Sequence, residues 1–173
     1  VQLLWAAAGS PKTTGTLPFT DVAPGAWYYD AVHWAYRTGL VSGTSPTTFT
    51  PDAAITRQDF TVILYAQAGR PAMIGTALAA FPDAGQVAGY AYAALTWAVE
   101  QGLIGGVGTP SGPQLAPRGY ATRAQVAVIL YRYLNDQTPE APEESTPAED
   151  TARVLVAYFS ATGNTEHIAE HLQ

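Results

Sequence analysis

Residues 55–60 read Ile55-Thr56-Arg57-Gln58-Asp59-Phe60, a run with the chemistry of a helix start. The Thr56 hydroxyl can cap the N-terminus of a helix, and Asp59, three residues on, can reach back to it. Ile55 and Phe60 are spaced as a hydrophobic staple across that cap. The run therefore predicts that a helix begins here.

The same run is part of an internal repeat. Thr56-Arg57 recurs as Thr122-Arg123, and Gln125 replaces Asp59. Other pairs recur at offsets that grow from 62 to 66, among them Phe19 and Phe81, Asp21 and Asp83, Trp34 and Trp97, Gly39 and Gly102, and Gly43 and Gly106. A growing offset places the insertions in loops. Residues 3–11 match residues 63–71 at a constant offset of 60, so we expect the chain to begin inside the last helix of a preceding repeat.

Each repeat is predicted to be two helices around a loop. Ala31, Val32, Ala35 and Tyr36 form an apolar stripe with the period of a helix, and Gly39 supplies a left-handed C-cap. Residues 43–52 and 105–119 are rich in Gly, Pro, Ser and Thr, which is typical of loops. Trp34 and Trp97 are expected in the core. His33, alone on its helix, is expected at the surface.

Charge is distributed unevenly along the chain. The formal net charge is −6, and six of the fourteen acids fall within residues 136–150, which contain no Lys or Arg. The rest of the chain is neutral, which argues against a broadly basic nucleic-acid face. The absence of cysteine excludes disulfides and Cys-ligated metal sites. No apolar run approaches the ~20 residues that a membrane span requires.

About three quarters of the chain is similar to the S-layer homology family of bacterial envelope proteins. The resemblance is carried by Phe19-Thr-Asp21-Val22, Trp27-Tyr28, Asp30-Ala31-Val32, Ala35, Gly39-Leu40, Gly43, Phe49-Thr-Pro51 and Ile55-Thr56-Arg57, and by their second copies. It implies an all-helical array, commonly of three repeats with pseudo-threefold symmetry. It also implies non-covalent attachment to anionic secondary cell-wall polysaccharide or peptidoglycan, outside the cell at the bacterial wall or S-layer.

The resemblance also implies which residues bind the glycan. A pyruvate ketal on a sugar presents a carboxylate, which a guanidinium can hold with two parallel hydrogen bonds. By carry-over from the family, the candidate glycan-binding residues are Arg57, Arg123, Asp21, Asp83, Gly43, Gly106 and Trp27. The alternative for the two arginines is a solvated position in the first helical turn, although the helix dipole there favours acids.

Some positions depart from the family pattern. The family usually follows Thr-Arg with Ala-Glu, whereas this chain has Gln58-Asp59 and Ala124-Gln125. Tyr90 stands where the first repeat has Trp27, and Ala93 replaces an aspartate. The departures at Tyr90 and Ala93 suggest that the second repeat is a weaker or purely structural copy.

Residues 135–150 and 151–173 differ in character from the repeats. The first segment is acidic and Pro-rich, which predicts an extended tether. Val154 to Phe159 is an apolar run typical of a buried strand, and Glu166 to Leu172 is predicted to be a short helix. His167 and His171 fit a zinc-peptidase pattern, but no third ligand is evident, so no metal site is predicted.

The C-terminal piece resembles the start of the flavodoxin family. The resemblance assigns the phosphate of FMN to Ser160, Thr162, Gly163, Asn164 and Thr165, at the N-terminus of the short helix. The alternative is an ordinary strand, turn and helix. We expect no detectable FMN binding by this chain alone, because the residues that would hold the flavin ring are not in it.

The sequence thus predicts a mainly α fold of helix-loop-helix repeats in a pseudo-symmetric array, followed by a truncated α/β flavodoxin-like unit. The predicted boundaries are 1–12 for the tail of a preceding repeat, 18–71 and 80–134 for two repeats, 135–150 for the tether and 151–173 for the flavodoxin-like start. The predicted function is wall anchoring of a flavin-dependent electron carrier or oxidoreductase with an unknown redox partner. The alternative is a protein-interaction scaffold without glycan binding. No catalytic residue is predicted.

Overall fold

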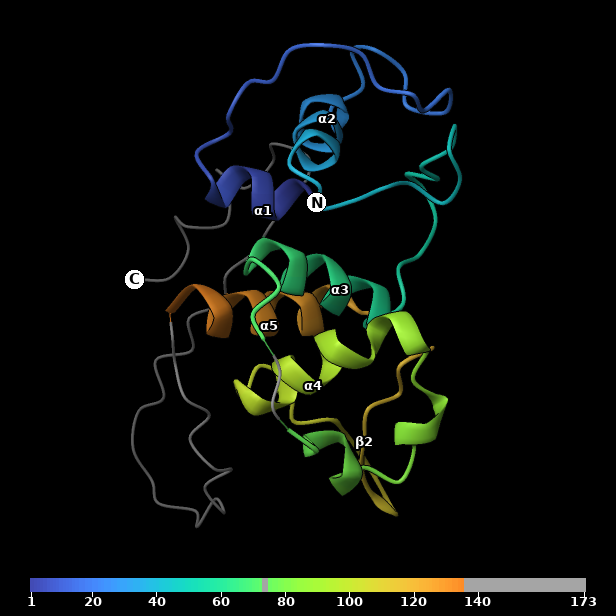
Figure 1. The fold of residues 1–173 in the computed structure, drawn as a ribbon, viewed down its shortest axis with the longest axis vertical. Coiled ribbons are helices and arrows are strands. Elements are labelled where there is room, and N and C mark those ends of the chain that lie inside the picture. The colour runs from blue at the N-terminus through green and yellow to red at the C-terminus, as the bar shows by residue number, and fades with distance from the viewer. Residues whose placement is uncertain (73–74, 136–173) are drawn as a thin grey trace, which may run out of the picture. The chain divides into compact units, whose positions relative to one another are not determined.

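The computed structural model describes residues 1–72 and 75–135, which all belong to one unit of the chain, Val1–Pro139. This part is mainly helical, with one small hairpin (Figure 1). Its elements are α1 (Gln2–Ala7), α2 (Tyr29–Arg37), α3 (Arg57–Gln67), the short 3₁₀ helices η1 (Ala77–Ala80), η2 (Ala84–Gln86) and η3 (Gly89–Ala91), α4 (Tyr92–Glu100), β1 (Val107–Thr109), β2 (Gly112–Gln114) and α5 (Arg123–Asn135). Within it, no helix has the length and apolarity needed to cross a membrane.

The two predicted repeats are confirmed as helix-loop-helix units, α2 with α3 and α4 with α5. The first helix of each unit ends at a glycine in the left-handed region, with φ of +75° at Gly39 and +65° at Gly102. Glycine adopts this conformation without a Cβ clash, so both C-caps follow from the sequence.

The short helix α1 has the geometry of the tail of a repeat. Gly9 and Gly69 have φ of +83° and +81°, and each follows a short turn after its helix. Trp5 donates its indole N–H to the carbonyl of Pro11 at 2.9 Å, and Tyr65 donates its hydroxyl to the carbonyl of Pro71 at 2.7 Å. The two pairs lie at the predicted offset of 60, so the ends of α1 and α3 make equivalent contacts, and the assignment of α1 to a preceding repeat stays a prediction.

The core joins both repeats. Trp34 and Trp97 are each 7% exposed, as predicted, and Ala35 and Ala98 beside them are fully buried. The small alanine side chains let neighbouring helices approach closely, and α3 packs against α4 as α1 packs against α2. A second, smaller cluster centres on Phe19, whose ring lies 5.1 Å from that of Tyr36 in an edge-to-face arrangement. It secures the loop of the first repeat to α2.

One predicted loop contains a hairpin. Strands β1 and β2 pair antiparallel, with Val107 opposite Gln114, whereas the first repeat has only an isolated bridge between Ser45 and Thr48. The extra residues of the second loop give the strands room to pair. Gly112 has φ of +99° at the turn, which a Cβ would oppose.

The prediction for His33 was wrong, because its side chain is buried with only 3% exposed. Its Nδ1 lies 2.5 Å from the hydroxyl of Thr13, and its ring stacks on Tyr29. The segment after α1 folds over this face of α2 and covers the ring. An isolated histidine on a helix carries no periodic signal of such a cover.

The tether and the flavodoxin-like start lie outside the described residues, and so do Ser160, Thr162, Gly163, Asn164 and Thr165. Asn135 is the final residue of α5 and donates its side-chain amide to the carbonyl of Tyr131 at 2.8 Å.

Candidate glycan-binding site

The first Thr-Arg junction is docked on the loop of the second repeat. Thr56 adopts an extended conformation, caps α3 by accepting from the N–H of Asp59, and donates its own hydroxyl to the Asp59 carboxylate at 2.5 Å. Thr56 also forms an isolated bridge with Tyr120. The backbone N–H of Arg57 donates to the carbonyl of Gly119 at 2.8 Å. The start of α3 is therefore an inter-repeat contact.

The Arg57 side chain completes this contact. It is 7% exposed, and its Nε donates to the carbonyl of Leu115 at 2.8 Å. Burial lowers the pKa of the Arg57 guanidinium, and the nearby charge of Asp83 acts in the opposite direction. The sequence placed Arg57 at a binding surface, whereas the structure places its guanidinium inside the junction between the repeats.

Asp21 and Asp83 stabilise equivalent turns in the loops of the first and second repeats. The Asp83 carboxylate accepts from the backbone N–H groups of Leu115 and Ala116, at 2.9 and 2.7 Å. Asp21 accepts from the N–H groups of Phe49 and Thr50, at 2.9 and 2.7 Å. These hydrogen bonds lower the pKa of the Asp21 carboxyl, and the bond from Thr50 has the largest effect. Both carboxylates thus stabilise a turn that includes a residue with positive φ, Ala116 or Thr50.

Gly43 and Gly106 each pack against a phenylalanine ring of their own repeat, Phe19 and Phe81 respectively. A Cβ on Gly43 would come within 2.4 Å of Cε1 of Phe19, and one on Gly106 within 2.9 Å of Cε1 of Phe81. The motif aspartates and glycines are thus brought together around each loop. Their contacts in the described residues are contacts of the fold, and their part in glycan binding stays a prediction.

The second Thr-Arg junction is exposed. Thr122 and Gln125 cap α5 reciprocally: the N–H of Gln125 donates to the Thr122 hydroxyl, and the N–H of Thr122 donates to the Gln125 side chain. Arg123 is exposed. Across residues 1–72 and 75–135, neither its guanidinium nor the backbone N–H groups of Arg123 and Ala124 have a hydrogen-bond partner. An unpartnered guanidinium thus lies beside unpartnered amides at the start of a 13-residue helix.

Two exposed aromatic side chains occupy equivalent positions in the two repeats. Trp27 is 77% exposed, and its ring makes an edge contact with Tyr28. Tyr90 is 65% exposed, and its hydroxyl hydrogen-bonds to Asp59 and Gln58. The sequence assigned no binding role to Tyr90, Gln58 or Asp59, although all three are departures from the family pattern. The departure from the family pattern was the sequence signal that could have drawn attention to them.

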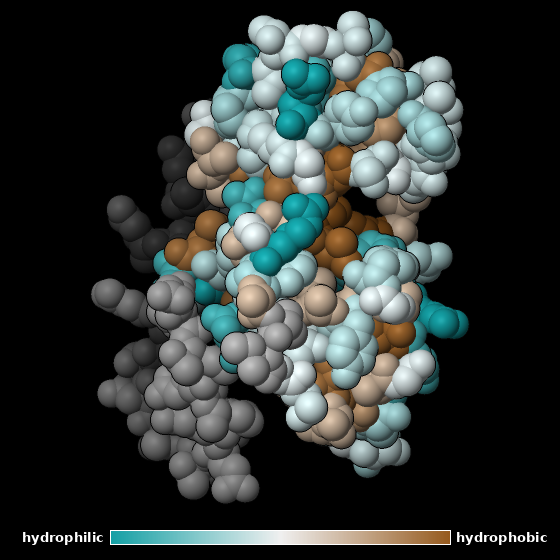
Figure 2. Space-filling model, viewed as in Figure 1, coloured by the Kyte–Doolittle hydropathy of each residue, from teal (hydrophilic) through white to brown (hydrophobic). Residues whose placement is uncertain are grey.

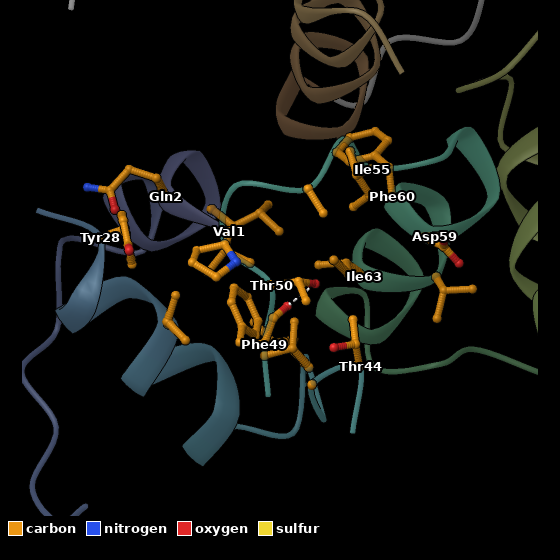
Figure 3. A pocket seen from close by; sticks show the side chains of 18 of the residues that line it. Val1, Gln2, Tyr28, Thr44, Phe49, Thr50, Ile55, Asp59, Phe60 and Ile63 are labelled. Atoms are coloured by element: carbon orange, nitrogen blue, oxygen red, sulfur yellow. Dashed lines mark hydrogen bonds between the residues drawn. The ribbon is translucent and has the colours of Figure 1, made fainter. Parts of the chain in front are cut away.

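A hollow of about 690 Å³ extends along this surface, and both Trp27 and Tyr90 line it. Figure 3 shows Tyr28 and Gln2 at one end and Asp59 at the other, with Phe49 and Thr50 between them. Figure 2 shows apolar side chains gathered within it. Among the described residues that line it, Asp59 is the only one with a carboxylate or guanidinium, and neither Arg57 nor Arg123 lines it.

Comparison with known proteins agrees with the repeat. The model of the S-layer homology domain matches residues 18–61 and 80–127, which together make up more than half of the chain. The chain belongs to the S-layer homology family. Its matched ranges begin at the same residues as the two predicted repeats.

The relatives carry different names. The chain is 34% identical over 131 residues to the surface-layer 125 kDa protein of Lysinibacillus sphaericus, covering 75% of this chain and 11% of that protein. It is 29% identical over 165 residues to an endoglucanase of Bacillus sp. (strain KSM-635), covering 88% of this chain and 17% of that protein. The solved undecaheme cytochrome from the S-layer of Carboxydothermus ferrireducens is similar with a TM-score of 0.40 and 21% identity, covering 81% of this chain and 21% of that one.

Family membership indicates where the protein is located. S-layer homology domains bind cell-wall polysaccharide, and the protein is associated with the S-layer at the cell surface. This S-layer homology chain spans less than a fifth of the length of the surface-layer protein and of the endoglucanase.

Proposed function

We propose that the repeats anchor the protein to an anionic secondary cell-wall polysaccharide, and that Arg123 holds a carboxylate of that polymer, such as a pyruvate ketal. The observation that carries this is the exposed start of α5, where the Arg123 guanidinium lies beside two unpartnered backbone amides within the described residues. A helix N-terminus and a guanidinium both favour an anion, and the guanidinium can donate two parallel hydrogen bonds.

The two arginines have different parts in this proposal. The Nε of Arg57 is engaged by the Leu115 carbonyl, so Arg57 supports the junction and Arg123 supplies the contact with the ligand. A guanidinium in solvent can reorient toward a carboxylate without breaking a hydrogen bond of the fold. Under this proposal the second repeat supplies the ligand contact, which is contrary to the sequence-based expectation that it is the weaker copy.

The test is co-sedimentation with purified wall sacculi, before and after chemical removal of ketal pyruvate. Wild-type protein is expected to sediment with untreated sacculi and less with treated ones, and Arg123→Ala should behave on untreated sacculi as wild type does on treated ones. Arg37→Ala removes a positive charge that is also exposed, in the last turn of α2, and is the matched control. Equal sedimentation of wild type with both preparations would contradict the carboxylate contact.

Salt separates this function from the alternative of a protein-interaction scaffold. Attraction between Arg123 and an anionic polymer is screened as ionic strength rises, with a Debye length of about 8 Å at physiological salt. Apolar docking of a partner protein on the exposed side chains of α5 would not weaken in this way. Binding that persists at about 1 M salt would favour the scaffold.

A flavin domain remains a separate part of the proposal, supported by the sequence. Ser160 to Thr165 offer hydroxyls and backbone amides directly after an apolar run of strand length, which suits the phosphate of FMN. The repeats would then locate an electron carrier or oxidoreductase at the wall. Visible absorbance of a bound flavin in the full-length gene product tests this, and protein that stays colourless after incubation with excess FMN and removal of the free FMN would contradict it.

A further inference from the structure

Residues 12–16, which we call the strap, follow α1 and contact α2 through their side chains (Figure 1). The strap makes no backbone–backbone hydrogen bond with any other described residue. Lys12 forms an ion pair with Asp30, and the Thr13 hydroxyl lies 2.5 Å from Nδ1 of His33. Polar contacts of two side chains therefore fix the strap on the helix.

The strap is anchored at both ends. Before it, Trp5 donates its indole N–H to the carbonyl of Pro11 at 2.9 Å. After it, Leu17 packs against the cluster of Phe19, which is buried. Within the strap, Gly15 has φ of +114°, which glycine adopts without a Cβ clash. Movement of the strap between these two anchors leaves the helices in place.

The two polar contacts differ in their surroundings. The side chains of Lys12 and Asp30 are 77% and 45% exposed, and an ion pair in solvent contributes little because water and salt screen it. His33 is buried on α2, where the Tyr29 ring stacks on it with 6.0 Å between the ring centroids. Closure of the strap therefore depends mainly on the contact of Thr13 with His33.

The second ring nitrogen of His33 is buried as well. Nε2 has no hydrogen-bond partner within the part of the chain that the structure describes. A neutral ring can donate from Nδ1 to the Thr13 hydroxyl and leave Nε2 as a bare acceptor. A protonated ring has an N–H on both nitrogens and a positive charge, so the closed strap would enclose a charged donor without an acceptor. The closed strap thus accommodates the neutral ring and disfavours the charged one.

The ionisable groups around the histidine do not supply the missing acceptor. The strap contributes Lys12, and α2 contributes Tyr29, Asp30, Tyr36 and Arg37 within one helical turn. Asp30 is engaged by Lys12. Helix α1, which also packs against α2, has no ionisable side chain. Among the described residues, no carboxylate hydrogen-bonds to the ring.

We infer that proton uptake by His33 opens the strap, which is closed at neutral pH and open in acid. A histidine ring in water takes up its proton near about pH 6.5, and an open strap lets both N–H groups donate to water. The closed state favours the form without the proton, so closure is favoured at higher pH and lost as pH falls. Opening uncovers this face of α2 and separates Lys12 from Asp30. The inference does not depend on the proposed anchoring function.

The experiment follows the contact of Thr13 with His33 by NMR in the whole chain, at about pH 7.5 and about pH 5, on either side of the ordinary histidine value. The nuclear Overhauser effect between the Thr13 methyl group and the His33 ring should be present at the higher pH and lost at the lower one. The heteronuclear Overhauser effect of the backbone of residues 12–16 should fall at the lower pH, while that of α3 stays unchanged. A contact that survives at the lower pH would overturn the inference, and so would unfolding of α3 together with the strap.

Two variants separate the histidine from the ion pair. His33→Gln places a neutral amide beside Thr13 and should abolish the pH dependence. Asp30→Asn removes the ion pair with Lys12 and is the matched control, because it should loosen the strap at both pH values and keep the pH dependence. Opening in acid that persists in His33→Gln, or disappears in Asp30→Asn, would overturn the inference.

A third variant tests the contact without changing the histidine. Thr13→Val keeps the shape of the side chain and removes the hydroxyl, so the strap should already be mobile at about pH 7.5. Far-UV circular dichroism of every variant at both pH values confirms that the helices are intact. A strap as rigid in Thr13→Val as in wild type would mean that the contact of Thr13 with His33 does not hold it.

Discussion

Arg57 and Arg123 begin equivalent helices in two repeats, but their surroundings differ. The backbone and side chain of Arg57 donate to carbonyls of the loop in the second repeat, and its side chain is buried. Arg123 is exposed at the start of α5. The same short motif can therefore join two repeats or leave its guanidinium exposed, and within the described residues the difference is that a loop docks on the first junction alone.

The largest expected effect is the loss of Arg57. Arg57→Ala leaves the buried Leu115 carbonyl without its donor and Asp83 without a nearby positive charge, and should lower the free energy of unfolding by about 3 kcal/mol. Arg123→Ala should change it by no more than about 0.5 kcal/mol, because Arg123 is exposed. Urea unfolding followed by circular dichroism measures both. Equal losses would mean that the two junctions are energetically equivalent.

Replacing the loop glycine should also destabilise the protein more in the first repeat, at Gly43, than in the second, at Gly106. Gly43→Ala places a Cβ 2.4 Å from Phe19 and 2.6 Å from the backbone oxygen of Thr48, whereas Gly106→Ala meets its nearest atom at 2.9 Å. Both have positive φ, so we expect losses of about 2–3 and about 1–2 kcal/mol respectively. Thermal unfolding measures them. Gly105→Ala, which meets nothing within 4 Å, is the control and should have little effect.

A smaller effect should depend on pH. The N–H groups of Thr50 and Phe49 lower the pKa of Asp21 below its ordinary value of 3.8 in the folded state. The folded state therefore favours the ionised carboxylate, and its contribution to stability is complete above pH 3.8 and is lost as pH falls through the folded value. Asp21→Asn should be less stable than wild type at pH 7, and the difference should shrink toward pH 3. An unchanged difference at both pH values would contradict this origin.

The sequence predicted the elements that depend on local chemistry. Helix caps at Thr56 and Thr122, the glycine C-caps and the buried Trp34 follow from spacing and side-chain type, and the structure confirms them. The repeat also predicted which loops would match. Each of these features is set by residues within one or two turns of one another.

The surroundings of Arg57 could not be predicted in this way. Its acceptor is the carbonyl of Leu115, 58 residues away, and a backbone carbonyl leaves no trace in side-chain identity. His33 was missed for a related reason, since Thr13 covers it from a segment without helical periodicity. By contrast, Gln58, Asp59 and Tyr90 could be noted in the sequence as departures from the family pattern. Only the structure shows that the Tyr90 hydroxyl hydrogen-bonds to both of the other side chains.

The smallest expected effect distinguishes the two helix caps. Thr56→Ala and Thr122→Ala each remove a hydroxyl that accepts from a backbone N–H, a loss of about 1 kcal/mol. The Thr56 hydroxyl also donates to Asp59, which in turn holds Tyr90, so its loss should reach the second repeat. Thr122 has no such link, because Gln125 returns its hydrogen bond to the same junction. Thr56→Ala should therefore increase the mobility of the Tyr90 ring, measured by its NMR relaxation, while Thr122→Ala should lower stability and leave the mobility of that ring unchanged.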